Sequence, residues 1–297
     1  MDTKYICVWA SYISDFEFDW IKELLPENTI FINDEIKEKE YPNTPCIYIT
    51  NYWCGYKEQL EKANHNFGII YLGEEIFSDK TDDFLNNPKC KFIWRNYVHP
   101  KYIDNPKVSF FPCAYKKGFT KNPLNNLNKK YVWSFAGAVH HNDRIIPIET
   151  MKCITPYKLH TTQANSFDDP EGLPLDEYKN TIEESMYVLC PPGKIVMECS
   201  RLYEALEAGS VPITISNGLE SRLKYNPSYH HFVFPKELGE LPFIIVNDWK
   251  DVINIIYEIN NNGTYLNMQK ECKLYWIKCK EYWKKKLKDD INTKIIG

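Results

Sequence analysis

Residues 186–215 read MYVLCPPGKIVMECSRLYEALEAGSVPITI, and they carry the strongest indication of the fold. Its first apolar run, Met186–Cys190, stops at two prolines and a glycine, which is typical of the end of a buried strand. Apolar residues at helical spacing follow Ser200, the expected N-cap, and Gly209 suits the position just after that helix. The apolar run 211–215 then predicts the next parallel strand. The stretch therefore predicts one βαβ unit.

The same alternation of short apolar runs and helical patterns extends over the whole chain. Strands that alternate with helices indicate βαβ units and parallel sheets, so the fold class is α/β. The expected strands are Tyr5–Ala10, Thr29–Ile32, Ile47–Thr50, Gly68–Leu72, Phe92–Trp94, Ser109–Phe111, Tyr131–Ala136, Tyr157–Thr161, Met186–Cys190, Val211–Ile215, His231–Phe234 and Phe243–Val246. The expected helices are Asp15–Leu25, Arg144–Cys153, Asp176–Glu184, Ser200–Ala208, Asp248–Asn260 and Tyr265–Lys288.

A polar stretch rich in Asn and Lys, residues 115–130, is the expected linker. It predicts a Rossmann-like domain at residues 1–125 and a second one at 126–262. A C-terminal helix at 263–297 is expected to pack back on the first domain. Because ligands of open parallel sheets bind outside the carboxyl ends of the strands, we expect the two domains to face each other across a cleft.

The composition excludes several classes of function. The net charge is -4, with Lys and Arg spread along the chain, so nucleic acid is not an expected partner. No run of apolar residues is long enough for a membrane span, and the first residues lack the apolar core of a signal peptide. We therefore expect a cytoplasmic location. The ten cysteines show no C-x-x-C spacing, so no metal site is expected.

The helix that follows Ser200 carries charged residues suited to a nucleotide. A loop that ends at a helix N-terminus presents backbone N–H groups and the positive end of the helix dipole to a phosphate. Arg201 adds a fixed charge and a bidentate donor. Glu204, one turn later, can accept hydrogen bonds from the two ribose hydroxyls. The same spacing also fits an ordinary βαβ unit in which Arg201 and Glu204 pair on the surface.

The order of residues here resembles the exostosin-like glycosyltransferases. Their pattern has a strand that ends in Cys-Pro-x-Gly, then Ser-Arg, Glu-Ala, Gly and Pro-Ile, as found between Cys190 and Ile213. The segment 240–249 resembles the family's later Pro-Phe and Trp element. Phe-Ala-Gly at 135–137, followed by Arg144, resembles the strand and loop that open its nucleotide domain. The sequence WRNY at 94–97 resembles the branch that includes the xylosyltransferase acting on dystroglycan glycans.

This resemblance implies a GT-B fold with the donor on the second domain. It implies an inverting, metal-independent transfer from a nucleotide sugar, usually UDP-linked, to a hydroxyl of a glycan or glycoprotein. No cofactor is implied, since the nucleotide sugar is a substrate. By the same carry-over Arg144 and Arg201 would hold the diphosphate and Glu204 would bind the ribose. The other substrate-binding residues would be Gly137, Gly193, Lys194 and Ser200.

Inverting transfer needs a general base for the proton of the acceptor hydroxyl. The candidates are polar residues that follow predicted strands, where a loop would face the ligand: Asp143, His140 and Glu74, with His141 and His99 as further choices. The residues before Arg144 can equally well cap the helix that begins there. The pattern leaves the choice among these candidates open.

Two other functions fit the same residues. The first is a transferase that uses a GDP-sugar, similar to a fucosyltransferase, because the residues that would read the base of the nucleotide have no recognisable pattern. The second is a catalytically inactive, carbohydrate-binding protein on the same fold, since a fold does not determine an activity. The retained charges at Arg201 and Glu204 favour an active donor site.

Overall fold

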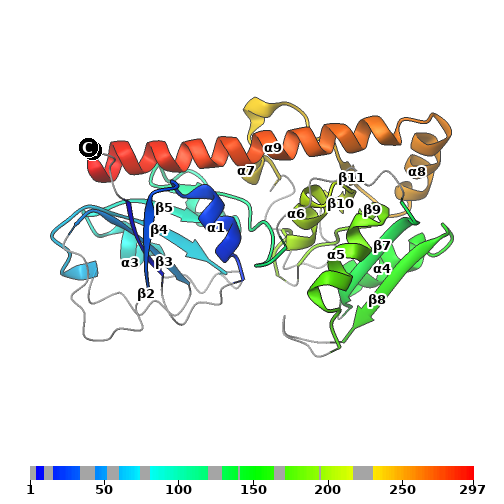
Figure 1. The fold of residues 1–297 in the computed structure, drawn as a ribbon, viewed down its shortest axis with the longest axis horizontal. Helices are drawn as coiled ribbons and strands as arrows, with labels where there is room; N and C mark the ends of the chain where they lie inside the picture. The colour runs from blue at the N-terminus through cyan, green and yellow to red at the C-terminus, as the bar shows by residue number, and fades with distance from the viewer. Residues whose placement is uncertain are drawn as a thin grey trace. The chain divides into compact units, whose positions relative to one another are not determined.

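A computed structural model describes residues 5–9, 16–33, 44–51, 60–73, 81–119, 129–139, 141–163, 171–193, 195–216 and 230–297. The chain forms two compact units. Unit 1 comprises residues 1–113 together with 280–297, and unit 2 comprises residues 114–279. Each unit has its own sheet flanked by helices (Figure 1). The expected boundaries at 125 and 262 differ from this division, which runs through the C-terminal helix.

The described strands of unit 1 form a parallel sheet in the order β2-β1-β3-β4-β5-β6. Every residue of β4 is buried, which explains why its sequence is apolar without alternation. The strands are β1 (Tyr5–Trp9), β2 (Thr29–Asn33), β3 (Cys46–Asn51), β4 (Phe67–Leu72), β5 (Cys90–Arg95) and β6 (Val108–Phe110). The helices before β6 are α1 (Phe18–Leu24), α3 (Thr81–Leu85) and the 3-10 turn η1 (Pro100–Tyr102).

The described strands of unit 2 form a second parallel sheet in the order β11-β10-β9-β7-β8. They are β7 (Tyr131–Ala138), β8 (Tyr157–Thr162), β9 (Ser185–Leu189), β10 (Val211–Ile215) and β11 (Ile244–Val246). The helices are α4 (Asn142–Met151), α5 (Leu175–Glu183), α6 (Ser200–Glu207), α7 (His230–Val233), η3 (Lys236–Leu238), α8 (Asp251–Asn261), α9 (Tyr265–Asp290) and the final π-helical turn η4 (Ile291–Ile296). The predicted α/β class is confirmed.

The predicted βαβ unit is present as β9, α6 and β10, with one correction. Ser200 is the first helical residue and Cys199 the N-cap, so the expected capping role of Ser200 is wrong. At the other end, Gly209 has a φ of +69° and its N–H donates to the carbonyl of Leu206 at 3.2 Å. The N–H of Ser210 donates to Ala205, which completes a Schellman motif.

The predicted strand at 231–234 is wrong, because its residues belong to helix α7 and its end. The N–H of Phe234 donates to the carbonyl of His230 at 2.8 Å, which closes one helical turn. The Phe234 ring packs near Tyr203 and Phe243, with centroids 5.7 and 5.4 Å away. A four-residue apolar run has no periodicity that separates a strand from a buried helical turn.

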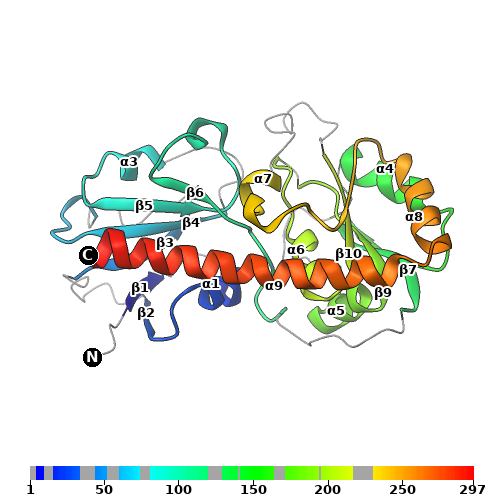
Figure 2. The ribbon, with the colours of Figure 1, turned by 90° about the horizontal axis from the view of Figure 1, so that it is seen from above.

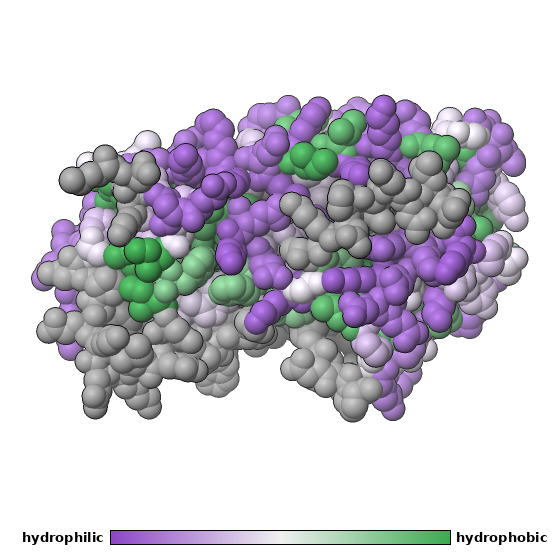
Figure 3. Space-filling view, in the orientation of Figure 1, coloured by the Kyte–Doolittle hydropathy of each residue, from purple (hydrophilic) through white to green (hydrophobic). Residues whose placement is uncertain are grey.

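Helix α9 contributes to both units and is continuous along its length (Figure 2). In unit 2, the indole of Trp276 donates to the Glu207 carboxylate at 2.7 Å. In unit 1, Trp94 donates to Asp290 at 2.8 Å and its ring lies 5.4 Å from that of Trp283. Residues 280–297 thus pack on the first unit. Hydrophilic residues predominate along α9, with scattered hydrophobic ones (Figure 3).

Among the described residues, no helix combines the length and the apolarity that crossing a bilayer requires.

Candidate functional site

The strand order of unit 2 reverses between β7 and β9. β8 lies on one side of β7, whereas β9 and then β10 lie on the other side. In open parallel sheets the carboxyl ends of the strands at such a reversal leave a crevice where ligands bind. The segments at these ends are Ala136–Ala138 of β7 and Pro191–Gly193 after β9. Any functional side chains of this unit are therefore expected around these two segments.

Arg201 lies in this position and is fixed by the backbone of β7. It is buried, and its Nε and Nη2 atoms donate to the carbonyl oxygen of Ala136 at 3.1 and 2.7 Å. Its guanidinium group lies 4.3 Å from the centre of the Phe135 ring. The remaining nitrogen, Nη1, is buried and has no hydrogen-bond partner among the described residues. A buried guanidinium nitrogen left in this state is well suited to an anionic ligand.

Gly137 lets the Arg201 guanidinium approach the strand. A Cβ atom at this position would lie 2.4 Å from Nη2 of Arg201, which is well inside contact distance. Its φ of +146° also lies in the region that residues with a side chain rarely adopt. Both the geometry of the strand end and the place of the guanidinium therefore require glycine here.

Arg144 ties the two strand ends together. From α4, its Nη1 donates to the carbonyl of Ala138 at 2.9 Å and its Nε to the carbonyl of Pro192 at 3.2 Å. Burial raises the pKa of the Cys199 thiol, and the positive charges of Arg201 and Arg144 oppose this rise. Both arginines thus act on the residue that precedes α6. The structure thus brings Arg144 and Arg201, the two residues predicted to bind a diphosphate, to the same edge of the sheet.

The loop between β9 and α6 is tightly wound. A Cβ atom on Gly193 would lie 3.0 Å from the carbonyl oxygens of Val196 and Glu198, so the close turn favours glycine. Ser200 is half-buried in the first turn of α6. The N-cap residue Cys199 makes no side-chain capping hydrogen bond. Lys194 lies outside the described residues.

Glu204 lies in a buried network rather than in an exposed pair with Arg201. Its Oε2 accepts a hydrogen bond from the hydroxyl of Tyr178, and its Oε1 accepts one from the backbone N–H of Lys116 at 3.4 Å. The Lys116 ammonium lies 4.6 Å from the centre of the Tyr178 ring. Burial raises the pKa of Glu204, and the hydrogen bond from Tyr178 opposes this rise. The role of Glu204 in ribose binding stays a prediction.

Tyr178 and Lys116 were missed at the sequence level. They are 26 and 88 residues from Glu204, and neither stands in a pattern that indicates a site. The spacing of the apolar residues of α5 was the available signal for Tyr178, because Tyr178, Thr181 and Ile182 form the buried face of this helix.

Of the candidate bases, Asp143 and His141 lie together at the start of α4. Asp143 is completely buried, and its Oδ2 lies 3.9 Å from Nδ1 of His141. His141 is the N-cap residue of α4, although its side chain makes no capping hydrogen bond. His140 and Glu74 lie outside the described residues. No group of three or more His, Cys, Asp or Glu residues within the described part of the chain is arranged to hold a metal ion.

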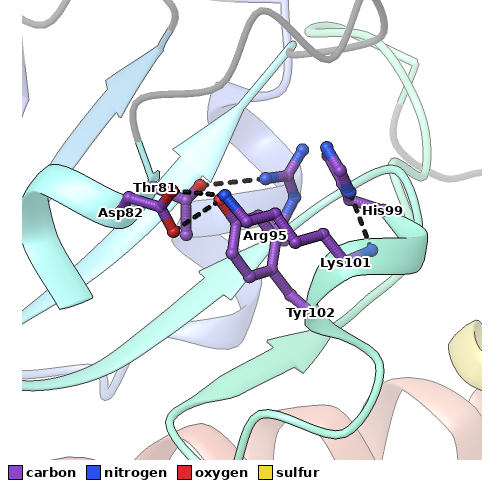
Figure 4. Close-up of polar contacts among 6 residues, drawn as sticks. All are labelled: Thr81, Asp82, Arg95, His99, Lys101 and Tyr102. Atoms are coloured by element: carbon purple, nitrogen blue, oxygen red, sulfur yellow. Dashed lines mark hydrogen bonds and ion pairs between the residues drawn. The ribbon is translucent and has the colours of Figure 1, made fainter.

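His99 belongs to a separate polar cluster in unit 1 (Figure 4). Its Nδ1 accepts from the backbone N–H of Lys101 at 3.1 Å, which caps η1. Lys101 and Tyr102 both bind the carboxylate of Asp82, and the hydrogen bond from Lys101 lowers the pKa of that group. Beside them the buried Arg95 donates to the hydroxyl of Thr81 at 2.9 Å. His99 therefore stabilises a turn of unit 1.

The segment that contains both arginines matches a known family. Residues 114–296 match the sequence profile of a family described as the RXYLT1 C-terminal domain. The chain belongs to the RXYLT1 C-terminal domain family. It is 28% identical over 225 residues to human ribitol-5-phosphate xylosyltransferase 1, and the match covers 69% of this chain and 49% of that protein. The chain thus spans about half the length of this curated relative. The predicted resemblance to the exostosin-like group and its xylosyltransferase branch is confirmed.

Solved structures share the architecture at low identity. HepE from Anabaena, crystallised in complex with UDP, is similar over 98% of this chain and 100% of that chain, with a TM-score of 0.52 and 9% identity. An α1,3-fucosyltransferase is similar over 94% of this chain and 90% of that chain, with a TM-score of 0.49 and 12% identity. The likeness to HepE concerns the fold alone and agrees with the predicted α/β GT-B fold, which is confirmed.

Proposed function

We propose that this chain is a glycosyltransferase that takes a sugar from a UDP-linked donor and transfers it to an acceptor hydroxyl with inversion. The observation that carries the proposal is Arg201, buried at the reversal of strand order in unit 2 with Nη1 lacking a partner among the described residues. Arg144 and the start of α6 lie at the same edge. The family, and the UDP in the HepE structure, support the same function.

The two arginines suit the departure of a diphosphate. As the bond between the sugar and the diphosphate breaks, negative charge grows on the phosphate oxygens. A fixed guanidinium group stabilises that charge without reorganising, because backbone carbonyls already hold it in place. The dipole of α6 adds to the field near its first turn. With these charges, we propose that the transfer needs no divalent metal.

The acceptor and the sugar are proposed from the relative. Its name specifies a xylosyl group and ribitol 5-phosphate, so a pentosyl donor and a hydroxyl of a phosphorylated polyol or of a glycan are the first substrates to test. Glu204 would bind the ribose, with Gly137, Gly193, Lys194 and Ser200 around the phosphates. Asp143, His140 and Glu74 are the bases proposed from sequence.

The test is the release of nucleoside diphosphate from a panel of UDP-sugars and GDP-sugars, with and without polyol phosphates and short glycans. We expect acceptor-dependent release of UDP, unchanged by EDTA, and a product with inverted anomeric configuration by NMR. Turnover of GDP-sugars alone would replace the UDP assignment by the fucosyltransferase-like alternative. A protein that binds neither nucleotide and hydrolyses no donor would contradict the proposal as a whole.

A further inference from the structure

Arg201 and Glu204 are oppositely charged neighbours on α6 that bind different partners. Their i, i+3 spacing places the two side chains beside each other on the helix, where an arginine and a glutamate can form an ion pair. Both residues are buried, and buried charges are usually paired. Arg201 instead donates twice to the carbonyl oxygen of Ala136, and within the described part of the chain no ion pair joins it to Glu204. Something other than the two side chains must therefore keep them apart.

Two donors hold the Glu204 carboxylate. Its Oε2 accepts from the hydroxyl of Tyr178 on α5, and its Oε1 accepts from the backbone N–H of Lys116 at 3.4 Å. Helices α5 and α6 lie side by side in unit 2, so the Tyr178 hydroxyl reaches the carboxylate from the neighbouring helix (Figure 1). Each carboxylate oxygen thus has a neutral donor, which satisfies the buried group without the guanidinium of Arg201.

Tyr178 is itself fixed in place. Its ring packs edge-on against that of Phe119, with centroids 5.9 Å apart, and the Lys116 ammonium lies 4.6 Å from its centre. Burial and the nearby charge of Glu204 raise the pKa of Tyr178, so its hydroxyl keeps the proton that it donates. The hydroxyl therefore has a defined position relative to α6, and so does the carboxylate that it binds.

This arrangement leaves one nitrogen of Arg201 for a ligand. Its Nη1 is buried and has no hydrogen-bond partner among the described residues. A Glu204 carboxylate released from Tyr178 could form a charge-assisted hydrogen bond with the guanidinium, because the spacing on α6 brings the two within reach. The charge of Arg201 would then be neutralised inside the unit, and its attraction for an anionic ligand would fall.

We propose that Tyr178 is a positioning residue of the donor site, which holds the Glu204 carboxylate away from Arg201 and thereby keeps Nη1 available to the diphosphate of the donor. This inference rests on the proposed function. Lys116 contributes through its backbone N–H and through its ammonium group over the Tyr178 ring. Tyr178 acts through Glu204 and needs no contact of its own with the substrate.

The first test is Tyr178→Phe, with Tyr187→Phe as the matched control. The control removes the hydroxyl of another buried tyrosine of unit 2, which donates to Asn260 at 3.1 Å. Isothermal titration measures the affinity for UDP and for inorganic pyrophosphate. We expect Tyr178→Phe to weaken both ligands about 10-fold to 100-fold, the range of one hydrogen bond to a charged group. Tyr187→Phe should bind both ligands as the wild type does.

The second test separates this role from a loss of packing. Glu204→Gln removes the charge that would pair with the guanidinium, so the double variant Tyr178→Phe/Glu204→Gln should regain the wild-type affinity for pyrophosphate. Glu204→Gln alone should bind pyrophosphate at least as tightly as the wild type. A double-mutant cycle then shows a strong coupling between the two positions. If Tyr178 only supported the fold, the second substitution would restore nothing.

Three outcomes would overturn the inference while the proposed function stands. One is a Tyr178→Phe variant with wild-type affinity for both ligands, and another is a double variant that binds pyrophosphate no better than Tyr178→Phe does. The third is a Tyr178→Phe variant that binds UDP weakly but pyrophosphate normally, which would assign Tyr178 and Glu204 to the ribose alone. A wild type that neither binds UDP nor consumes any donor would instead contradict the proposed function itself.

Discussion

The two units carry chemically different side chains at the same place in their sheets. In unit 2 the reversal of strand order holds Arg201 and Arg144, and backbone carbonyls fix both guanidinium groups. In unit 1 Glu17 precedes α1, and the amide of Asn96, which follows β5, donates to its carboxyl. An arginine stays charged when it is buried, whereas a carboxyl responds to burial by changing its pKa.

This difference shows how burial acts on the two kinds of group. For Arg201, burial removes the water that would compete for its hydrogen bonds. Its charge is permanent, and Nη1 has no partner among the described residues. For Glu17, burial moves the pKa to about 7, so its charge depends on the pH of the medium. The first group keeps its charge at any physiological pH, whereas the charge of the second changes near neutral pH. Substitutions in each unit should therefore affect different properties of the chain.

Arg201→Met should have the largest effect, because it removes the charge and all the donors of unit 2's central side chain. We expect kcat/KM to fall about 1,000-fold, at the upper end of what the loss of one preorganised donor costs. Lys152→Ala, which removes an exposed lysine, is the matched control. Steady-state kinetics with UDP-sugars measure the effect, and circular dichroism confirms the fold. Equal values of kcat/KM for Arg201→Met and the control would show that the charge of Arg201 does not contribute to the reaction.

Glu17 should also determine how stability depends on pH. Its pKa is raised from 4.5 to about 7 in the folded chain, so between these values the folded state binds more protons than the unfolded state. The free energy of unfolding therefore falls as the pH rises through this window, by up to about 3 kcal/mol, and stays lower above it. Glu17→Gln should flatten this dependence and melt at a higher temperature than the wild type at about pH 8.

Urea unfolding of both proteins at about pH 4.5, 6 and 8 measures this effect. A Glu17→Gln variant that is less stable than the wild type at the highest pH would show that the ionised carboxyl stabilises unit 1. That result would contradict the destabilising effect that burial is expected to have on this charge.

Gly137→Ala tests whether the backbone of unit 2 positions the charge. The new methyl group collides with Nη2 of Arg201, so the guanidinium must move. We expect UDP affinity to fall about 10-fold to 100-fold, together with a loss of stability of about 1–3 kcal/mol from the strained φ. Gly239→Ala is the matched control, since its φ is +90° but no atom lies within 4 Å of the added Cβ. Equal UDP affinities of the two variants would contradict this role of Gly137.

Trp94→Phe should have the smallest effect and concerns unit 1 alone. It removes the hydrogen bond to Asp290 but keeps an aromatic ring against Trp283. A lost hydrogen bond to a charged acceptor costs about 1–2 kcal/mol of stability. The affinity for UDP should not change, because the arginines belong to unit 2. Isothermal titration measures the UDP affinity, and thermal melting of the same preparation measures the stability. A weakened UDP affinity would contradict the assignment of UDP binding to unit 2 alone.

Much of the fold was predictable, because apolar runs of four to eight residues mark buried parallel strands. β10 was predicted to the residue, and the other strands to within a few residues at their ends. The segment 231–234 failed because one turn of helix and a short strand have the same apolar content. The point within α9 where the first unit resumes has no local signal, since residues 280–297 join that unit through contacts such as that of Trp94 with Asp290, far apart in sequence.

The site was predictable only where its residues lie in one local pattern. Arg201 stood out by its place in the first turn of a predicted helix and Arg144 through the family resemblance, and the structure brings both to the same edge of the sheet. Their acceptors are backbone carbonyls, which no residue type reveals. Glu17 was missed because its properties come from burial and from Asn96, 79 residues away. Long-range contacts of this kind leave no trace in the spacing of residues.

The most direct test of the central claim, a UDP-binding edge built around Arg201, is the melting temperature of the chain with UDP, GDP, CDP and ADP. A ligand at 100 times its Kd adds about 2.7 kcal/mol to the free energy of unfolding, which is easily measured. We predict that UDP raises the melting temperature of the wild type and leaves that of Arg201→Met unchanged. The claim would be contradicted if GDP but not UDP raised it, or if UDP stabilised the two proteins equally.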